Sequence, residues 1–448
     1  MYKLLLAVPF LAGIAVLQGL TVEIETFHGT DAGVYQLPTI ELFRDHLDFS
    51  DYPSAQTPLF HLLTTAWGEL VGFDLWKLRL LNVAFSYGAA LALMRLLRRT
   101  TGLAAFPSFA LTLAFVLSPY FFGASFTLLT DNLAILFALL ALERIHAFSR
   151  TGSVPAFAAA CLLIGAAVLT RQSFLWLVAV AVFVLLRRRE LRPALIGFGL
   201  LALALVPFGL LVVEWNGLVP PSADPASCGL CTESPGFGRD ALSLRTVGFT
   251  LALLGAYAAV VLGPSVLRWA RVLRSPAGRM ARSALGSPTG RAVVAFVRGK
   301  PPRRLGPQHL LGLAVVGSFA LLLISPLEFI PIEPGRAGDA GWLWKVSDQL
   351  PSVLGSSLLF WLLVPLGAGA GAILIWRAGW AALPTVVLGA FLIAALPVAL
   401  VYQKYFDPFM LLAVALFARP MDFRGRRDYA GIGVVCVASV AYALSFAG

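Results

Sequence analysis

The chain has 448 residues, of which 59% are hydrophobic and 13% charged, and its mean hydropathy is +0.84. A soluble protein cannot bury that much apolar side chain, so the composition excludes a soluble enzyme and predicts an all-α integral membrane protein. The net charge of +11 would suit nucleic acid, but in a membrane protein an excess of arginine more often fixes the orientation of the helices. We therefore expect membrane lipids, and no nucleic acid, as partners.

Apolar windows along the chain predict a polytopic helix bundle. A spanning helix needs about 20 largely apolar residues, and such windows predict about 11 to 13 transmembrane helices in one domain over residues 1–448. The windows lie near 3–20, 77–95, 104–122, 127–146, 154–170, 173–187, 193–213, 247–267, 308–325, 352–376, 381–400, 404–418 and 429–447. The first resembles a secretory signal, but no small-residue cleavage site follows it, and we expect a retained helix. The windows within 154–187 form either two short helices or one helix broken at Arg171.

The arginines predict on which side of the membrane each connection lies. They gather in alternate connections, as at Arg95, Arg98 and Arg99, and in a basic segment over 268–307. Because positively charged loops stay on the cytoplasmic side, this pattern places the N-terminus and the basic loops inside. The connections expected outside are 21–76, 214–246 and 326–350.

The first external connection, 21–76, is expected to carry the catalytic function. Loops longer than roughly 12–15 residues in compact proteins are usually functional or disordered, and the aromatic content here argues against disorder. Asp31 follows a Gly-Thr turn just outside the predicted first helix. A carboxylate at that level can act as a general base on a substrate that arrives partly through the lipid.

Three further charged groups lie at the outer ends of predicted helices, where charge is costly and usually retained for a role. Asp131 opens a helix, where it either caps the helix N-terminus or takes part in catalysis. Arg171 suits a phosphate, or alternatively an ion pair with Asp131 or Glu214. Lys404 begins the window 404–418, where it either anchors the helix at the lipid interface or binds an anion.

Together these groups suit transfer of an activated sugar from a lipid phosphate to a hydroxyl. A carboxylate takes the hydroxyl proton, and arginine or lysine stabilises the phosphate as its charge grows. The chain has no nucleotide-binding glycine loop, zinc pattern or nucleophile elbow, which disfavours a soluble nucleotide sugar as donor. We expect no cofactor and no dedicated metal site. Cys228 and Cys231 could form a local disulfide, contribute half a metal site or do neither.

Several short motifs resemble those of the dolichyl-phosphate-glucose-dependent α-1,2-glucosyltransferases, which are polytopic enzymes of the GT-C superfamily. The first is Asp31-Ala-Gly-Val-Tyr-Gln-Leu-Pro38, followed by Gln56-Thr-Pro-Leu. The others are Leu129-Thr-Asp131, Thr170-Arg-Gln172-Ser, Val213-Glu-Trp215-Asn216-Gly217 and, more faintly, Gln403-Lys-Tyr405-Phe-Asp-Pro408. They follow the family's order over most of the chain. The chain departs from the family at Ala32, where the family has a second acidic residue, and lacks its late His-Pro segment.

The resemblance implies a GT-C helix bundle that transfers a hexose, with inversion, from a polyprenyl-phosphate sugar in the outer leaflet. It implies that Asp31 is the general base and that Asp131 positions the acceptor or the base. It also implies that Arg171, Gln172, Trp215 and Asn216 contact substrate. The full set of residues expected to bind substrate is Tyr35, Gln56, His61, Arg171, Gln172, Trp215, Asn216, Lys404 and Tyr405. Glucose is the expected sugar, with mannose or another hexose open. The acceptor would be a glycan or lipid-linked glycan outside the cytoplasmic membrane, or in the ER lumen of a eukaryote.

Two other classes of protein stay open at this point. A transporter or flippase of lipid-linked sugars would share the bundle and the anion-binding arginine. It would typically also have inverted repeats and helices broken near the membrane midplane, and the sequence has no evident repeat. A non-catalytic membrane scaffold would leave the charges at Asp31, Asp131 and Arg171 without a purpose.

Overall fold

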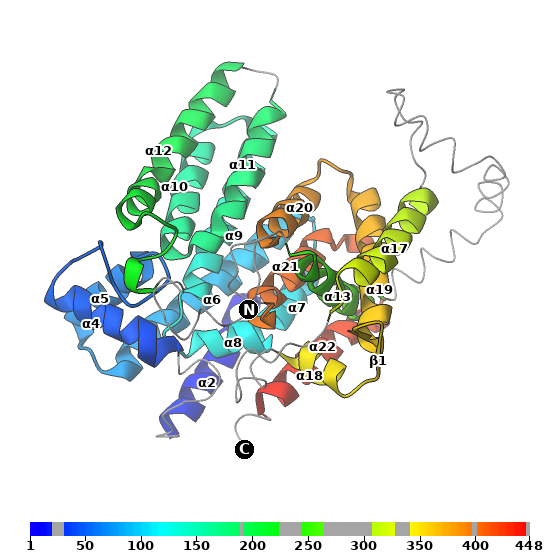
Figure 1. The fold of residues 1–448 in the computed structure, drawn as a ribbon, viewed down its shortest axis with the longest axis horizontal. Helices are drawn as coiled ribbons and strands as arrows, with labels where there is room; N and C mark the ends of the chain where they lie inside the picture. The colour runs from blue at the N-terminus through cyan, green and yellow to red at the C-terminus, as the bar shows by residue number, and fades with distance from the viewer. Residues whose placement is uncertain are drawn as a thin grey trace.

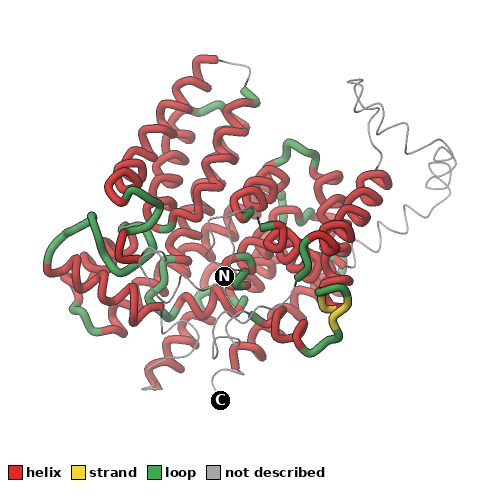
Figure 2. Tube along the Cα trace, viewed as in Figure 1, coloured by secondary structure: helices red, strands yellow, loops and turns green. Residues whose placement is uncertain are grey.

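The protein is almost entirely helical wherever the structure describes it. The computed structural model describes residues 1–19, 31–188, 191–223, 243–263, 307–327, 341–396 and 401–444. Helices fill these ranges apart from loops and one short antiparallel hairpin, formed by β1 (Ser352–Val353) and β2 (Ser356–Ser357) (Figures 1 and 2). The predicted basic segment 268–307 lies almost wholly outside the described residues, as do Cys228 and Cys231.

The helices follow the predicted windows in chain order (Figure 1). In the first half they are α1 (Tyr2–Leu5), α2 (Val8–Gly19), η1 (Ala32–Gln36), α4 (Leu37–Asp45), α5 (Leu59–Val71), α6 (Leu75–Thr100), α7 (Ala105–Val116), α8 (Pro119–Ser125), α9 (Asp131–Thr151), α10 (Val154–Thr170), η2 (Gln172–Leu175), α11 (Trp176–Leu186), α12 (Leu191–Trp215) and η3 (Pro221–Ala223). In the second half they are α13 (Leu244–Val261), α17 (Pro307–Ile324), α18 (Trp342–Asp348), α19 (Leu358–Ala378), α20 (Leu383–Ala395), η6 (Gln403–Tyr405), α21 (Asp407–Phe417), η7 (Pro420–Asp422), η8 (Arg426–Tyr429) and α22 (Ala430–Leu444).

The length and apolar character of these helices define an all-α polytopic membrane protein. Among the described residues, α6, α9, α12, α13 and α19 are long and apolar enough to cross a membrane. Helices α7 and α8 make a sixth span if they are taken as one helix bent by 74°. Every predicted window contains a described helix, but several of these helices have only 10 to 17 residues. The described chain therefore has fewer full-length spans than the 11 to 13 helices that we expected.

The turn from α9 into α10 determines where two of the predicted site residues lie. Helix α9 ends at Gly152, whose left-handed φ of 72° favours a residue without Cβ. The Ser153 hydroxyl then accepts a bond from the Ala156 amide and caps α10. Helix α10 runs back antiparallel to α9 and ends at Arg171, which has extended backbone. Asp131, at the start of α9, and Arg171 are thereby brought to the same end of the bundle.

Glycines allow the closest contact between two spanning helices, α13 and α19. A Cβ at Gly367 in α19 would collide with the carbonyl of Leu251 in α13. A Cβ at Gly255 in α13 would collide with the carbonyl of Leu363. Close packing of small residues is a usual source of helix association in membranes, because lipid provides no hydrophobic driving force. This contact fixes the second half of the bundle, which carries η6.

The described part of the connection predicted to be the first external one, from residue 31 on, is folded rather than an open loop. It contains the π-helical turn η1 and the helices α4 and α5, which lie across one end of α10 and α12 in Figure 1. A small apolar cluster of Phe43, Tyr52 and Trp215 joins this connection to the end of α12. Hydropathy windows miss α4 and α5 because these helices carry polar residues on their buried faces, such as His61 in α5.

The opposite end of the bundle holds paired arginines. The Arg95 Nε donates to Glu143 Oε2 at 2.6 Å, and Arg99 pairs with the same carboxylate, whose side chain is 1% exposed. Arg377 pairs with the buried Asp422 at 2.9 Å. Helix α6 therefore continues beyond the predicted window of 77–95, because its last turns hold the Glu143 carboxylate of α9.

Candidate active site

A small cavity lies at the end of the bundle where η1, α9, α10 and η6 meet. It is lined by Asp31, Gln36, Gln56, Tyr120, Ala124, Leu129, Thr130, Asp131, Asn132, Ile135, Arg171, Lys404, Tyr405 and Pro408. Six of the residues predicted from the sequence are in this lining: Asp31, Gln56, Asp131, Arg171, Lys404 and Tyr405. They come from five segments that are far apart in the chain. The structure thus brings both predicted catalytic carboxylates and both predicted anion-binding cations into one cavity.

Two ion pairs organise the charged side of the cavity. The Arg171 Nη1 lies 2.6 Å from Asp131 Oδ2, and the same nitrogen donates to the Thr130 hydroxyl at 3.3 Å. The Lys404 Nζ lies 2.8 Å from Asp31 Oδ2. Two cations and two carboxylates therefore balance each other. The first pair matches the ion pair with Asp131 that was one of the two interpretations of Arg171.

Tyr405 joins the two ion pairs. The Arg171 guanidinium lies 5.2 Å from the centre of the Tyr405 ring, and the Lys404 ammonium lies 5.3 Å from it. Cations over an aromatic face are attracted by its negative charge distribution. The Tyr405 ring is therefore in contact with the cation of each ion pair.

The paired groups keep partial access to solvent. The side chains of Asp131 and Asp31 are 28% and 37% exposed, against 12% for Arg171 and 22% for Lys404. The cavity between them is only about 50 Å³, which is the space of one or two water molecules. This volume is smaller than a sugar phosphate, so side chains of the lining would have to move to admit such a ligand, and the four charges lining the cavity sum to zero.

A buried polar network holds the η6 turn in place. The Gln403 Oε1 accepts from the Leu343 amide at 2.9 Å, and the Gln403 Nε2 donates to Asp407 Oδ1 at 2.9 Å. The Tyr257 hydroxyl donates to the same carboxylate oxygen. Gln403 and Asp407 are fully buried and flank the site residues Lys404 and Tyr405. Bonds to α13 and α18 therefore fix the position of the lysine that pairs with Asp31.

Asn132 fixes the start of α9 in a similar way. Its side-chain amide is fully buried and donates to the Ser86 hydroxyl at 2.8 Å and to the Phe121 carbonyl at 3.0 Å. These bonds tie α9 to α6 and α8. The carboxylate of the preceding residue, Asp131, is thereby held at the cavity wall.

His61 lies behind the cavity rather than in its lining. It is fully buried among Phe43, Tyr52 and Phe60, and its Nε2 lies 2.6 Å from Gln36 Oε1. Burial lowers the pKa of His61 to about 3, so the ring is neutral at physiological pH. A neutral ring can donate its Nε2 proton to Gln36, which lines the cavity. His61 therefore reaches the site through Gln36.

Four other residues predicted to contact substrate do not line this cavity. The Gln172 Nε2 donates to the Ala55 carbonyl at 2.6 Å, and the Trp215 Nε1 donates to the Phe49 carbonyl at 2.7 Å. Asn216 follows with a left-handed φ of 48°. Tyr35 is 43% exposed on η1. Gln172 and Trp215 tie the first external connection to α10–α12, and their substrate contact stays a prediction.

The sequence reasoning missed four polar residues of the lining: Gln36, Tyr120, Thr130 and Asn132. The position of Gln36 in the lining can be explained from the structure, but no pattern in the sequence predicts it. The π-helical turn η1 bonds the Leu37 amide to the Ala32 carbonyl, five residues back, and so places Gln36 with Asp31. Single π-turns are frequent at functional sites. No group of three or more His, Cys, Asp or Glu side chains in the described ranges could hold a metal ion.

Comparisons with known proteins add a distant structural likeness. No family model matches the chain, and no curated protein matches it. It is similar to the crystal structure of ArnT from Cupriavidus metallidurans bound to undecaprenyl phosphate, with 17% identity, a TM-score of 0.41, and coverage of 91% of this chain and 76% of that one. For the apo crystal structure of the same ArnT the identity is 17% and the TM-score 0.36, with 95% and 78% of the two chains covered.

Proposed function

We propose that this protein is a membrane glycosyltransferase of the GT-C type that moves a hexose from a polyprenyl-phosphate sugar to a hydroxyl of a glycan or lipid-linked glycan. The observation that supports this proposal is the meeting of two carboxylates and two cations in one cavity at the end of a helix bundle. A lipid-anchored sugar phosphate needs a cation pair for its phosphate, a base for the acceptor and access from the membrane. The cavity offers residues for the first two.

In the proposed reaction Asp31 is the general base. Its carboxylate takes the proton of the acceptor hydroxyl while that oxygen bonds to the anomeric carbon from the face opposite the phosphate. The bond between the anomeric carbon and the phosphate oxygen breaks, and its electron pair leaves with the phosphate. The configuration at the anomeric carbon is inverted. The phosphodiester thereby becomes a phosphate monoester with one more negative charge.

Arg171 and Lys404 would stabilise that growing charge. A planar guanidinium can donate two parallel hydrogen bonds to phosphate oxygens, and the ammonium adds a compact point charge. Both cations are held by carboxylates without ligand, at 2.6 and 2.8 Å. A phosphate that draws Lys404 to itself would release Asp31. Binding of the donor would thus free the Asp31 carboxylate to accept a proton. Asp131 would keep the Arg171 guanidinium oriented toward the phosphate.

The donor sugar is expected to be glucose, with mannose or another hexose as the alternative. The site is expected on the external side of the membrane, because the arginine-rich connections lie at the other end of the bundle. Gln36 and Gln56 in the lining offer amides for sugar hydroxyls.

Release of polyprenyl phosphate by the purified protein in nanodiscs tests this proposal. We would compare polyprenyl-phosphate glucose with the mannose compound against a panel of glycan acceptors, for the natural chain, Asp31→Asn and the control Asp45→Asn. Asp45 is an exposed carboxylate of the same external connection. We expect release with one donor, loss of about 100-fold or more in Asp31→Asn, and no change in Asp45→Asn.

Two outcomes would contradict parts of the proposal. Full activity in Asp31→Asn would transfer the role of base to Asp131. Movement of labelled lipid-linked sugar across the membrane, without any glycosidic bond formed, would favour a transporter instead.

A further inference from the structure

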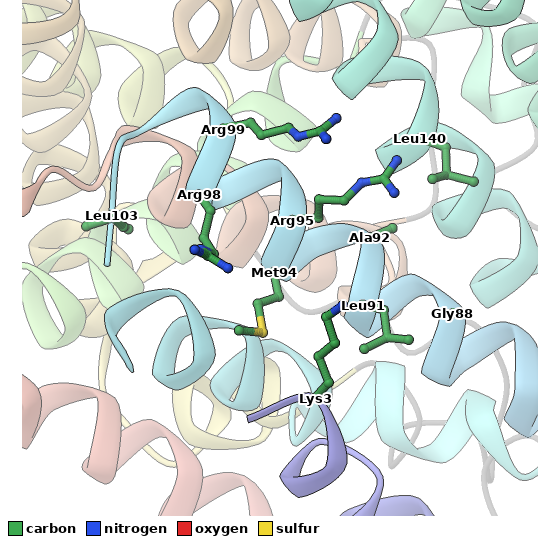
Figure 3. Close-up of a pocket in the computed structure, with 10 residues that line it drawn as sticks. All are labelled: Lys3, Gly88, Leu91, Ala92, Met94, Arg95, Arg98, Arg99, Leu103 and Leu140. Atoms are coloured by element: carbon green, nitrogen blue, oxygen red, sulfur yellow. The ribbon is translucent and has the colours of Figure 1, made fainter. Parts of the chain in front are cut away.

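A second and larger cavity lies at the opposite end of the bundle from the candidate active site. Its volume is about 700 Å³, and Figure 3 shows its lining, to which α6 contributes most residues. Along α9, Leu140 in this lining is nine residues from Asp131, which at 1.5 Å per residue is about 14 Å of helix. The two cavities therefore lie at different depths in the membrane.

Four basic side chains and no acidic one line this cavity: Lys3, Arg95, Arg98 and Arg99. Arg95 and Arg99 share the buried carboxylate of Glu143, which neutralises one of their two charges. Within the described ranges, Arg98 and Lys3 form no ion pair. Counted over the described residues, the cavity therefore keeps an excess of about three positive charges, which a ligand with an anionic group would neutralise.

The remaining wall of the cavity is apolar. Leu91 and Met94 lie beside the basic side chains on α6, and Leu140 faces them from α9. In Figure 3 the Lys3 side chain extends from α1 toward α6, between Leu91 and Met94. A wall of this kind would not favour a soluble anion alone, but it fits the start of an acyl chain.

The N-terminal turn is anchored at this cavity. The Tyr87 hydroxyl donates to the Lys3 carbonyl at 3.0 Å, and the Tyr2 ring packs on Phe109 at 5.2 Å. Lys3 is therefore held at the rim by its own backbone. The rim lies at the end of the bundle where arginines gather, which the distribution of charge predicts to face the cytoplasm.

We propose that this cavity binds an anionic glycerophospholipid of the cytoplasmic leaflet. Its phosphate is held by Arg98 and Lys3 at the rim, and the upper part of one acyl chain lies against Leu91, Met94 and Leu140. Basic cavities between membrane helices on the cytoplasmic side are a recognised form of lipid headgroup site. The ligand class follows from the combination of excess positive charge, an apolar wall and a position at the membrane surface.

Native mass spectrometry tests this proposal by counting the lipid retained by the full chain. The protein would be titrated with phosphatidylglycerol and, separately, with phosphatidylcholine of the same acyl chains. The variants are Lys3→Gln, Arg98→Gln and the double variant. Arg150→Gln is the control, because Arg150 is an exposed arginine at the end of α9 outside the cavity. Arg95 and Arg99 are left intact because they hold a buried carboxylate.

We expect one tightly retained phosphatidylglycerol, and about fivefold weaker binding for each removed charge, or roughly 30-fold in the double variant. Arg150→Gln should bind like the natural chain, and Arg98→Lys should restore most of the affinity. Equal affinity of the double variant and the natural chain would overturn the proposal, as would equal retention of phosphatidylcholine. Competition by glycerol phosphate at the same concentration as the lipid would show a site for soluble phosphate esters instead. Melting temperatures of all variants would identify any loss of folding. If the glutamine variants are destabilised, the affinity of Arg98→Lys, which keeps the positive charge, decides whether the proposal holds.

Discussion

Replacing Asp131 with asparagine should tighten the binding of a phosphate-headed lipid while it reduces turnover. Arg171 Nη1 lies 2.6 Å from Asp131 Oδ2, so a phosphate bound at the other donors of the guanidinium would lie near that carboxylate. We take the distance between the two anions as roughly 5 Å. Two unit charges at that distance repel each other by about 3 kcal/mol at an effective dielectric constant of about 20.

The side chain of Asp131 is 28% exposed, which screens part of this repulsion. We therefore expect about half of it, or ~1.5 kcal/mol, which is roughly a tenfold gain in affinity for Asp131→Asn. Arg171→Gln should have the opposite effect, because a charge-assisted hydrogen bond is worth about 1.5–3 kcal/mol. That loss corresponds to roughly 10- to 150-fold weaker binding.

Isothermal titration of a short-chain polyprenyl phosphate into the detergent-solubilised protein measures both effects. Asp45→Asn is the matched control, because it removes one carboxylate charge from the same end of the molecule at an exposed position. Weaker binding by Asp131→Asn, with an unchanged melting temperature, would refute the reasoning. It would mean that Arg171 needs its carboxylate partner for orientation more than it is inhibited by it.

Three further predictions concern stability and pH. Glu143→Gln should destabilise the protein by about 1–2 kcal/mol, because Arg95 and Arg99, which are about half exposed, lose their charge-assisted hydrogen bonds to the buried carboxylate; an unchanged unfolding midpoint in mixed detergent would contradict this. Gly367→Ala should lower the thermal midpoint at a cost of about 1–3 kcal/mol, because its methyl meets the backbone of α13, whereas Gly389→Ala, with no neighbour within 4 Å, should not. Burial lowers the pKa of His61 from 6.5 to about 3, so the unfolded chain takes up the proton first as the pH falls and stability is lost below about pH 6.5. Between pH 7 and 5 the loss should be about 2 kcal/mol more in the natural chain than in His61→Gln, and parallel pH profiles of the two would exclude it.

Much of the helical architecture could be predicted from the sequence because apolar windows report on the membrane directly. The window 127–146 corresponds to α9, and the break at Arg171 between α10 and η2 is one of the two arrangements expected there. The windows gave poor boundaries where helices continue through polar residues. Helix α6 runs on to Thr100 because its arginines hold Glu143, and hydropathy has no measure of such a pair.

The site could be predicted only in part. Charge at the outer ends of helices identified Asp31, Asp131, Arg171 and Lys404, and these four residues meet in one cavity. The pair of Arg171 with Asp131 was one of the arrangements expected from the sequence. The pair of Lys404 with Asp31 was not, because no local pattern relates the position of residue 31 to that of residue 404.

The other members of the lining depend on backbone geometry or tertiary contact. Gln36 reaches the cavity through a π-helical turn, for which the sequence has no reliable signal. Tyr120 lies there because α7 and α8 bend by 74°. The apolar context of Tyr120 in the sequence indicated only membrane burial.

The ion pair between Asp31 and Lys404 also has a consequence for biosynthesis. The two residues are 373 positions apart, so Asp31 leaves the ribosome long before Lys404. Until η6 is inserted, a nascent chain in the membrane carries the Asp31 carboxylate without the Lys404 ammonium that pairs with it. The proposed anion site then contains Arg171 but not its second cation. A partly translated chain would therefore hold a lipid phosphate with one cation instead of two until η6 has entered the bilayer.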